Sequence, residues 1–339
     1  MRIVLLILFL LFLGCENKQK VPVVLGFDGS YSSIAKELKN GMLIAQEEGG
    51  VEFDFINNDN DKILNKKIDK KLINEHKKLI IGHITSSLTK DAVPLFNKTN
   101  TLLFSPTAST NELSNKDDNF IRIQPAKNYQ TLKSVMKHMA NFIDNKKLNI
   151  IYDKNNEAYA KSIINSFLDK RDKYIHIDKI IPINENLKFD INMSEPILII
   201  GSSTLSANIV KKLKKRNFND LIFVSGSAFT NEFLKQAKEA SDGVLFFSTF
   251  NPLSDNKKYI KFREEFIDRF GYEPSSFNVK GYEIAKITDK IIDKKDIKKA
   301  LINHTFNGLQ GKIHINKYGD TIRETHIYIV NNQTFQKVE

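Results

Sequence analysis

Short apolar runs alternate with amphipathic helical patterns along almost the whole chain after residue 20. The first apolar run, at 21–27, is typical of a buried strand, and residues 34–48 have the apolar spacing of a helix with one buried face. The same pair recurs with a strand pattern at 51–57 and a helical pattern at 63–76. Because strands that alternate with helices form parallel sheets covered on both faces, we predict an α/β fold of doubly wound sheets.

A second series of the same kind begins at 120–125. Its strands are expected at 148–153, 174–180, 196–202, 221–226 and 243–250, and its helices at 129–143, 158–168, 207–216 and 231–240. Further helices are expected at 259–270, 279–292 and 297–302, followed by strand-like segments at 312–316 and 325–338 with a hairpin turn at Asn331 and Asn332. Two such series indicate two similar lobes. No Pro- or Gly-rich linker separates them, so the crossing near 123–126 is expected to be a hinge.

Two hydroxyl-rich turns follow neighbouring strands, within 79–96 and 101–114. At the carboxyl ends of parallel strands, such turns direct free backbone N–H groups and hydroxyls into one crevice, where they can bind a small anion such as a carboxylate. The alternative is that these hydroxyls only cap helices. The residues concerned are Ser86, Ser87, Ser109 and Thr110. The presence of two neighbouring turns favours a binding site.

The N-terminal segment predicts export. Residues 1–14 combine one positive charge with an unbroken apolar run that is shorter than the roughly 20 residues of a membrane span, as in a signal peptide. The end of this run resembles the lipobox of bacterial lipoproteins, which implies cleavage before Cys15 and lipid on that residue. Residues 15–20 are then a lipidated tether. We expect an exported body, periplasmic or elsewhere in the cell envelope, that is anchored to the membrane through Cys15.

Composition and motifs exclude several functions. The net charge is +11, but the lysines are scattered along helices among Asp and Glu, so we expect no nucleic-acid partner. Cys15 is the single cysteine, and there is no GxGxxG, P-loop, HExxH or GxSxG motif. The seven histidines lack metal-ligand spacing, and His83 is interpreted as a packed residue at a strand end. We expect no metal, no cofactor and no catalytic residue, although an enzyme built on separated residues stays open.

The order of motifs resembles the type I periplasmic solute-binding proteins of ABC transporters, in particular the branched-chain amino-acid-binding group. The similar segments are 26–45, 80–87, 102–114, 150–162, 243–252, 262–285 and 306–320. The resemblance implies two lobes joined by a three-crossover hinge, with ligand bound in a cleft that closes over it. The N-terminal lobe then comprises 21–124 and 250–322, and the C-terminal lobe comprises 125–249 and 323–339.

The resemblance also implies ligand contacts. Ser86 matches a serine that holds the ligand carboxylate, Thr107 a residue that contributes backbone groups, and Ser109 a second hydroxyl. The other candidates are Ser87 and Ala108 in the same turns and Tyr159, Ser203 and Ser227 in the second lobe. Tyr31 and Phe277 are possible walls and equally compatible with the core.

Two positions depart from the family pattern. Ser227 stands where amino-acid binders carry a glutamate that pairs with the ligand ammonium, and Ser203 stands where some relatives carry an aromatic wall. A buried cation without a partner costs several kcal/mol, so a zwitterion would need another acid. The conceivable acids are Asp28, Asp153 and Glu157. The ligand classes left open are thus a carboxylate without ammonium, an amide and a larger polar solute.

These observations predict a substrate-binding lipoprotein of an ABC import system. We expect a monomer that captures a small polar solute, either an amino acid or a related carboxylate or amide, and delivers it to an ABC permease in the inner membrane. The alternatives are a ligand sensor or regulator with the same fold, and an exported enzyme.

Overall fold

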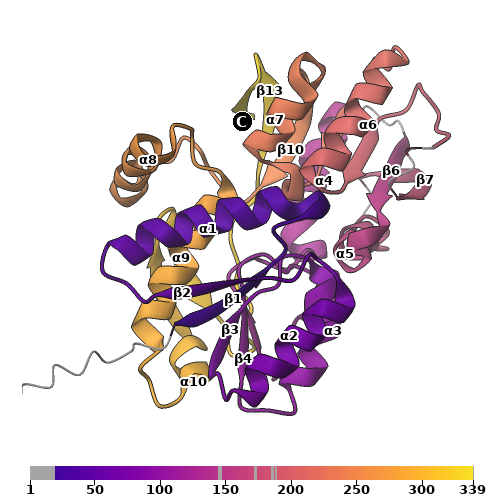
Figure 1. Ribbon diagram of the computed structural model, residues 1–339. Coiled ribbons are helices and arrows are strands. Elements are labelled where there is room, and N and C mark those ends of the chain that lie inside the picture. The colour runs from indigo at the N-terminus through magenta and orange to yellow at the C-terminus, as the bar shows by residue number, and fades with distance from the viewer. Residues whose placement is uncertain (1–19, 144–146, 172–173, 185–186, 188, 339) are drawn as a thin grey trace, which may run out of the picture.

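The computed structural model describes residues 20–143, 147–171, 174–184, 187 and 189–338, which form two α/β lobes (Figure 1). The expected signal peptide and Cys15 lie outside these residues, as does the tether except for Lys20. Within the described part of the chain, no helix has the length and apolar character needed to cross a bilayer.

The first lobe is built on a five-stranded parallel sheet in the order β2-β1-β3-β4-β5. The strands are β1 (Val21–Leu25), β2 (Phe53–Asn57), β3 (Leu79–Ile81), β4 (Leu102–Ser105) and β5 (Phe120–Arg122). The elements around the sheet are η1 (Gly29–Tyr31), α1 (Ser32–Glu47), α2 (Lys62–Asn74), α3 (Ser86–Phe96), η2 (Asn111–Leu113), α9 (Ser276–Ile291), α10 (Ile297–Leu301) and the hairpin of β11 (His304–Gly308) and β12 (Gly311–Ile315).

Both faces of this sheet are buried, which explains the unbroken apolar runs. Successive side chains of a strand point to opposite faces. On β1, Val23 therefore packs with the core formed by α1, α9 and α10, whereas Val24 packs with the core formed by α2 and α3.

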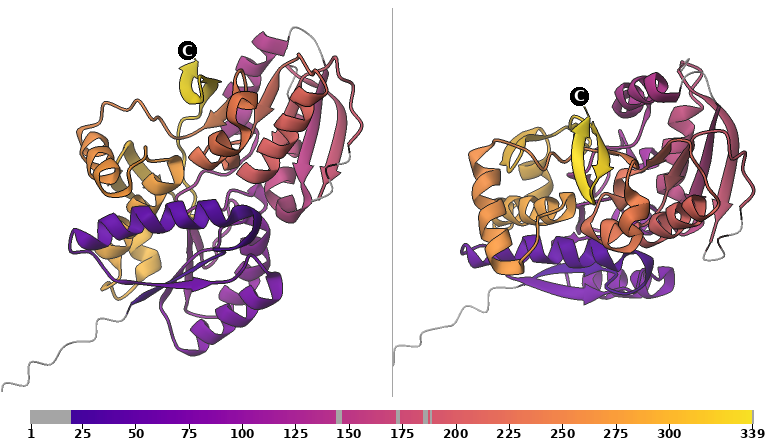
Figure 2. Two further views of the ribbon diagram at one scale, coloured as in Figure 1. Left: turned by 45° about the horizontal axis from the view of Figure 1, so that its top comes forward. Right: turned by 90° about the horizontal axis from the view of Figure 1, so that it is seen from above.

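The second lobe is built on a seven-stranded sheet in the order β14-β13-β10-β9-β8-β6-β7. Figure 2 shows both lobes from two further directions. The strands are β6 (Lys147–Asp153), β7 (His176–Ile183), β8 (Ile197–Ile200), β9 (Ile222–Val224), β10 (Leu245–Ser248), β13 (His326–Asn331) and β14 (Thr334–Val338). The helices are α4 (Tyr129–Ile143), η3 (Lys154–Asn156), α5 (Glu157–Phe167), α6 (Ser203–Lys215), η4 (Gly226–Ala228), α7 (Asn231–Ala237) and η5 (Lys238–Ser241). Helix α8 (Lys257–Phe270) follows the second crossing and precedes α9 of the first lobe. The strands from β6 to β10 pair in parallel, and β13 and β14 pair antiparallel. One face packs on α4 and α5, and the other packs on α6 and α7.

The chain passes between the lobes three times. The crossings run from β5 to α4, from β10 to α8 and from β12 to β13, within 123–128, 249–256 and 316–325. The expected fold of two doubly wound lobes with three crossovers is therefore confirmed. The expected lobe boundaries fall inside these three segments.

Two local expectations were wrong. Helix α6 begins at Ser203 rather than 207, because Ser202 caps it by accepting a hydrogen bond from the N–H of Leu205. Its first turn is rich in hydroxyls and therefore lacks an apolar pattern.

The last hairpin turns at Asn332 and Gln333, both with positive φ, which is one residue later than expected. Two adjacent positive φ values are typical of the tight turn that matches the twist of antiparallel strands.

Helices α1 and α9 approach each other closely because each carries glycine at the contact. A Cβ atom on Gly41 would lie 1.9 Å from the carbonyl oxygen of Asn278, and one on Gly281 would lie 2.1 Å from that of Leu38. Larger residues do not fit at either position. The contact fixes α9, which carries part of the site described below.

Glu37 is buried at the contact of α1 with α9 and predicts a pH-dependent stability. Its carboxylate accepts a hydrogen bond of 2.6 Å from the hydroxyl of Ser275, the capping residue of α9, and burial raises the pKa of Glu37 to about 7. The folded protein therefore keeps a proton on Glu37 that the unfolded chain releases near the ordinary glutamate pKa of 4.5. The stability that this proton contributes is fully present below pH 4.5 and is lost as the pH rises toward 7. This shift corresponds to about 3 kcal/mol.

We expect Glu37→Gln, which keeps the acceptor oxygen, to remove most of this loss. The measurement is urea unfolding followed by circular dichroism from acidic to neutral pH, since the chain has no tryptophan. The exposed Glu52, which pairs with Lys20 on the surface, provides the control Glu52→Gln, which should keep the wild-type dependence. A Glu37→Gln variant with the wild-type dependence would contradict the assignment.

Candidate ligand-binding site between the lobes

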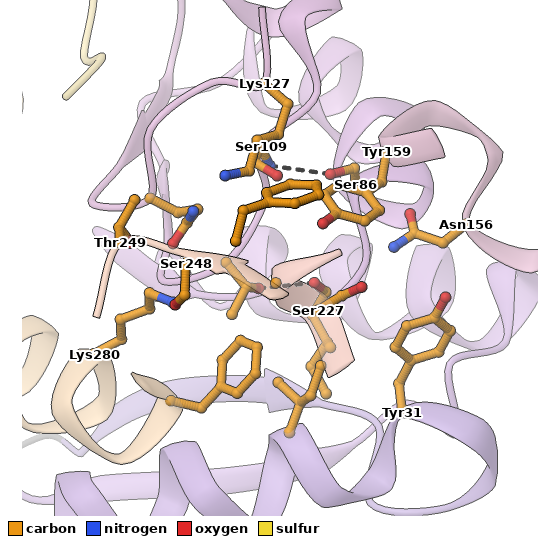
Figure 3. A pocket seen from close by; sticks show the side chains of 17 residues that line it. Tyr31, Ser86, Ser109, Lys127, Asn156, Tyr159, Ser227, Ser248, Thr249 and Lys280 are labelled. Carbon is orange, nitrogen blue, oxygen red and sulfur yellow. Dashed lines mark hydrogen bonds between the residues drawn. The ribbon is translucent and has the colours of Figure 1, made fainter. Parts of the chain in front are cut away.

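A pocket lies between the two lobes, at the carboxyl ends of strands from both sheets (Figure 3). In the first sheet the chain order reverses between β1 and β3, and in the second it reverses between β6 and β8. Such switch points leave a crevice beyond the strand ends. The cavity is about 40 Å³, far smaller than the pocket of a drug-sized ligand, so with the lobes arranged as here it suits only a small solute.

The pocket collects most of the residues expected from the sequence. Ser86, Thr107, Ser109, Tyr159 and Ser227 line it, as do the possible walls Tyr31 and Phe277. The lining residues that the sequence analysis did not single out are Ile34, Ile84, Gln124, Lys127, Asn156, Gly226, Phe247, Ser248, Thr249 and Lys280.

Ser86 is the first residue of α3, and its hydroxyl is held in one orientation. Its Oγ accepts hydrogen bonds from the N–H groups of Ser109, at 3.0 Å, and Thr110, at 3.2 Å. Because both bonds use the oxygen as acceptor, the hydroxyl proton remains available to donate. Thr85, not Ser86, caps the helix by accepting from the N–H of Leu88. The capping alternative therefore fails for Ser86, whose side chain lines the pocket with a hydroxyl proton free to donate.

The second turn presents side chains rather than free backbone N–H groups, which corrects the sequence-based expectation. The N–H groups of Thr107 and Ala108 donate to Ser105 Oγ, and those of Ser109 and Thr110 donate to Ser86 Oγ. Thr107 Oγ1 donates to the carbonyl of Ile84 at 2.7 Å. Thr110 caps the short helix η2, so the capping alternative holds there. The hydroxyl of Ser109 has no hydrogen-bond partner among the described residues and faces the pocket.

The second lobe supplies hydroxyl groups to the opposite wall. Tyr159 is buried, which raises its pKa, and its hydroxyl lies beside the side chains of Ser225 and Ser227. Ser227 Oγ donates to the carbonyl of Gly201 at 2.7 Å. Because its pKa is raised, the phenol of Tyr159 stays protonated. At Ser227, this wall presents a hydroxyl group where a carboxylate would be needed to pair with a ligand ammonium.

Three expected contact residues lie outside the lining. Ser87 instead joins the lobes: its N–H donates to Asn156 Oδ1 at 3.3 Å, and its Oγ accepts from the N–H of Ala158 at 3.2 Å. Ala108 packs in the core beneath α2 and α3. Ser203 shares a 2.8 Å hydrogen bond with Thr230 Oγ1, because the early start of α6 turns its side chain away from the pocket.

The acids considered as ammonium partners also lie outside the lining. Asp153 accepts a 2.8 Å hydrogen bond from the hydroxyl of Tyr31, Asp28 accepts from Asn57, and the half-buried Glu157 pairs with Lys161. His83 is fully buried and contacts Asp69 at 3.1 Å, as expected of a packed strand end.

Hydrogen bonds across the gap hold the lobes together. Besides those of Ser87 and the bond from Tyr31 to Asp153, Ser162 on α5 shares a 3.0 Å hydrogen bond with Thr110 Oγ1 and accepts from the N–H of Asn111 at 2.9 Å. These groups come from opposite lobes. The structure therefore shows a closed arrangement in which both lobes contact the pocket.

Two lysines line the pocket, Lys127 from the first crossing and Lys280 from α9, and each is at most 6% exposed. Burial lowers the pKa of Lys127 to about 8. Burial, followed by the charges of Arg323 and Lys127, lowers the pKa of Lys280 to about 7. A sequence signal for Lys280 existed, because it shares the helical spacing of the buried residues Ile284, Ile287 and Ile291.

Comparison with known proteins identifies the family. A family model described as the receptor family ligand-binding region matches residues 48–333. The chain belongs to this family. A search of curated proteins finds no significant match.

In the described part of the chain, no group of three or more His, Cys, Asp or Glu residues is arranged to hold a metal ion.

Solved structures share the fold of this receptor family member over nearly its whole length. A leucine-binding protein, LivK, from Thermotoga maritima has 21% identity and a TM-score of 0.79, with 94% of this chain and 97% of that chain covered. LivJ from Streptococcus pneumoniae, a branched-chain amino acid transporter substrate-binding protein in complex with isoleucine, has 19% identity and a TM-score of 0.81, with 94% and 99% covered. An ABC transporter solute-binding protein from R. palustris in complex with benzoate has 16% identity and a TM-score of 0.81, with 94% and 95% covered. The resemblance to type I solute-binding proteins is thereby confirmed at the level of fold.

Proposed function

We propose that this protein is the substrate-binding component of an ABC import system and captures a small carboxylate-bearing solute between its lobes. The observation that carries the proposal is the hydroxyl of Ser86, which two N–H groups fix so that its proton is free to donate in the interlobe pocket. Leucine, isoleucine and benzoate, named with the structures of similar fold, all carry a carboxylate.

The proposed contacts follow from the geometry. Ser86 and Ser109 donate hydroxyl protons to one carboxylate, beside the N-terminus of α3, whose dipole favours a negative charge. Thr107, Tyr159 and Ser227 complete the polar walls. Hydrogen bonds to a charged group contribute about 1.5–3 kcal/mol each, so a few of them account for micromolar affinity, about −8 kcal/mol. Ser87, Ala108 and Ser203 support the turns rather than contact the ligand.

Ligand capture is coupled to closure of the lobes. The pocket walls come from both lobes, so a bound solute stabilises only the arrangement in which the lobes are together. The direct contacts of Ser87 with Asn156 and of Tyr31 with Asp153 complete the closed form. A closed form of this kind is the state that a permease in the inner membrane would recognise.

We further propose that the protein is an exported monomer anchored to a membrane through lipid on Cys15, after removal of residues 1–14. The sequence of the N-terminal segment supports this proposal. The family description, a receptor ligand-binding region, supports sensing by the same closure as the second candidate function. Uptake of the bound solute that is lost on deletion of this gene would favour transport, and uptake that is unchanged would favour sensing.

A thermal-shift screen tests the binding function. Protein beginning at Glu16 is heated with amino acids, organic acids, amides and nucleosides. We expect a carboxylate-bearing solute to raise Tm increasingly with concentration, because a ligand that binds only the folded state stabilises it by mass action. Recovery of the solute chemically unchanged is expected of a binding protein. Stabilisation only by solutes that lack an anionic group, or turnover of the bound solute, would contradict the proposal.

A further inference from the structure

We propose that the interlobe pocket selects a small solute with two anionic groups and no ammonium, such as a dicarboxylate. Lys127, together with Ser86 and Ser109, binds one anionic group, and Lys280 binds the other. This inference rests on the proposed function of the pocket and defines its ligand class.

The charges in the pocket are of one sign. Among the described residues that line it there are two lysines and no aspartate or glutamate. Burying ammonium groups is costly unless an opposite charge accompanies them. A lining that holds two cations and no carboxylate therefore lacks its counter-charge, which an anionic solute would supply.

Neither lysine has a carboxylate partner within ion-pair distance among the described residues. Lys127 is fixed beside the second turn, because its backbone N–H donates to the carbonyl of Ser109 at 2.8 Å, and its Nζ lies 5.8 Å from the ring centre of Phe247. Lys280 Nζ has one neutral partner, Ser276 Oγ at 3.3 Å, and lies 4.6 Å from the ring centre of Phe277. Figure 3 shows the two lysines entering the pocket from separate elements.

The carboxylates nearest to Lys280 are already engaged and do not line the pocket. Glu283 accepts from Arg323 at 2.5 Å and from the N–H of Leu309 at 2.9 Å. Glu37 accepts from Ser275. Both raise the pKa of Lys280, but burial, Arg323 and Lys127 outweigh them and lower it.

Gln124 gives independent evidence of a missing polar partner. Gln124 lines the pocket and is 7% exposed. Its Oε1 atom has no hydrogen-bond partner among the described residues. Buried polar groups are rarely left unpaired in native proteins, so a ligand atom is the natural partner. The amide supplies either a donor or an acceptor, depending on which way it is turned.

The placement of the lysines sets the selectivity. Ser86, Ser109 and Lys127 lie together and suit one anionic group, while Lys280 on α9 suits a second one. An α-amino acid would bring an ammonium toward these cations, with Ser227 where an acid would be needed. Like charges in a buried site repel, so a zwitterion is rejected.

Binding of such a solute should be linked to proton uptake. An anion beside Lys127 and Lys280 raises the pKa of both groups above their values of about 8 and about 7 in the empty pocket. Affinity is then full below pH 7 and falls as the pH rises through 7 and 8, where the empty pocket loses protons that the complex keeps. Three other charged groups near the lysines also influence this pH dependence of affinity. They are Arg323, Glu283 and Glu37.

Titration calorimetry with glutarate, succinate, butyrate and leucine tests the inference on protein beginning at Glu16. We expect a dicarboxylate to bind about tenfold or more tightly than butyrate, and leucine not to bind. Lys127→Met and Lys280→Met should each lower dicarboxylate affinity about tenfold or more, without loss of thermal stability, because each removes a buried charge. Lys280→Arg should restore part of the affinity, and Lys298→Met, at an exposed ion pair, should change nothing.

Proton uptake is measured by repeating the titration in two buffers of different ionisation enthalpy. Any of three results would overturn the inference: no binding of a dicarboxylate at millimolar concentration, binding without proton uptake, or unchanged affinity in both methionine variants. Binding of leucine that is lost in Ser86→Ala would overturn the dianion inference and leave the proposed function standing. If a methionine variant fails to fold, Lys280→Arg and proton uptake by the wild type still decide the matter.

Discussion

A Ser86→Ala/Ser109→Ala double variant is expected to bind the solute at least about a hundredfold more weakly and to lose the ligand-induced rise in Tm. Each substitution removes a hydroxyl donor from the carboxylate. Loss of Ser86 Oγ also leaves the N–H groups of Ser109 and Thr110 without their acceptor, so the second turn loses its support. Thermal shift against solute concentration measures the effect.

The matched control is Ser203→Ala. Its hydroxyl bonds to Thr230 and lies outside the pocket lining, so this variant should bind like the wild type even though the family pattern placed Ser203 in the site. Wild-type affinity in the double variant would reject the assignment of Ser86 and Ser109. A loss in Ser203→Ala equal to that of the double variant would show that the effect is not specific to the pocket.

Asp320→Ala is expected to lower the free energy of unfolding by about 3–5 kcal/mol, because it leaves a buried guanidinium without its counter-charge. Arg122 is fully buried at the end of β5, and its Nε and Nη2 donate to Asp320 Oδ1 at 2.9 and 2.6 Å. Arg122 Nη1 also donates to the carbonyl of Thr110 at 2.7 Å, which ties this pair to the second turn. Ligand affinity should therefore fall along with stability.

Urea unfolding followed by circular dichroism measures this loss. The control is Asp117→Ala, which breaks an exposed ion pair with Lys298 and should leave stability almost unchanged. Equal stability of the two variants would contradict a structural role for the buried pair.

Periodicity predicted the fold because both faces of each sheet are buried, which leaves uninterrupted apolar strands between amphipathic helices. The positions of the two turns could also be predicted, since hydroxyl residues directly follow the buried strands β3 and β4, although Thr85 and Thr110 proved to be helix caps. The placement of Ser86 at the first position of α3 and of Ser109 opposite it followed from strand order.

The charge of the pocket could not be predicted in the same way. Lys and Arg together number 51, so nothing in the pattern distinguished Lys127, which is buried by a crossing between lobes rather than by a helix face. The side chain of Ser203 turns away because Ser202 starts the helix early, and Ser87 bonds across the gap only once the lobes meet. Such contacts depend on the relative position of the lobes, which sequence periodicity does not encode.

A crystal structure grown with the most stabilising solute tests the interlobe site most directly. We expect the solute between the lobes, with one anionic group within hydrogen-bond distance of Ser86 Oγ and Ser109 Oγ and another beside Lys280 Nζ. Solute bound instead in the apolar groove around Phe229 and Phe335 on the second lobe, with the interlobe pocket empty, would contradict the assignment.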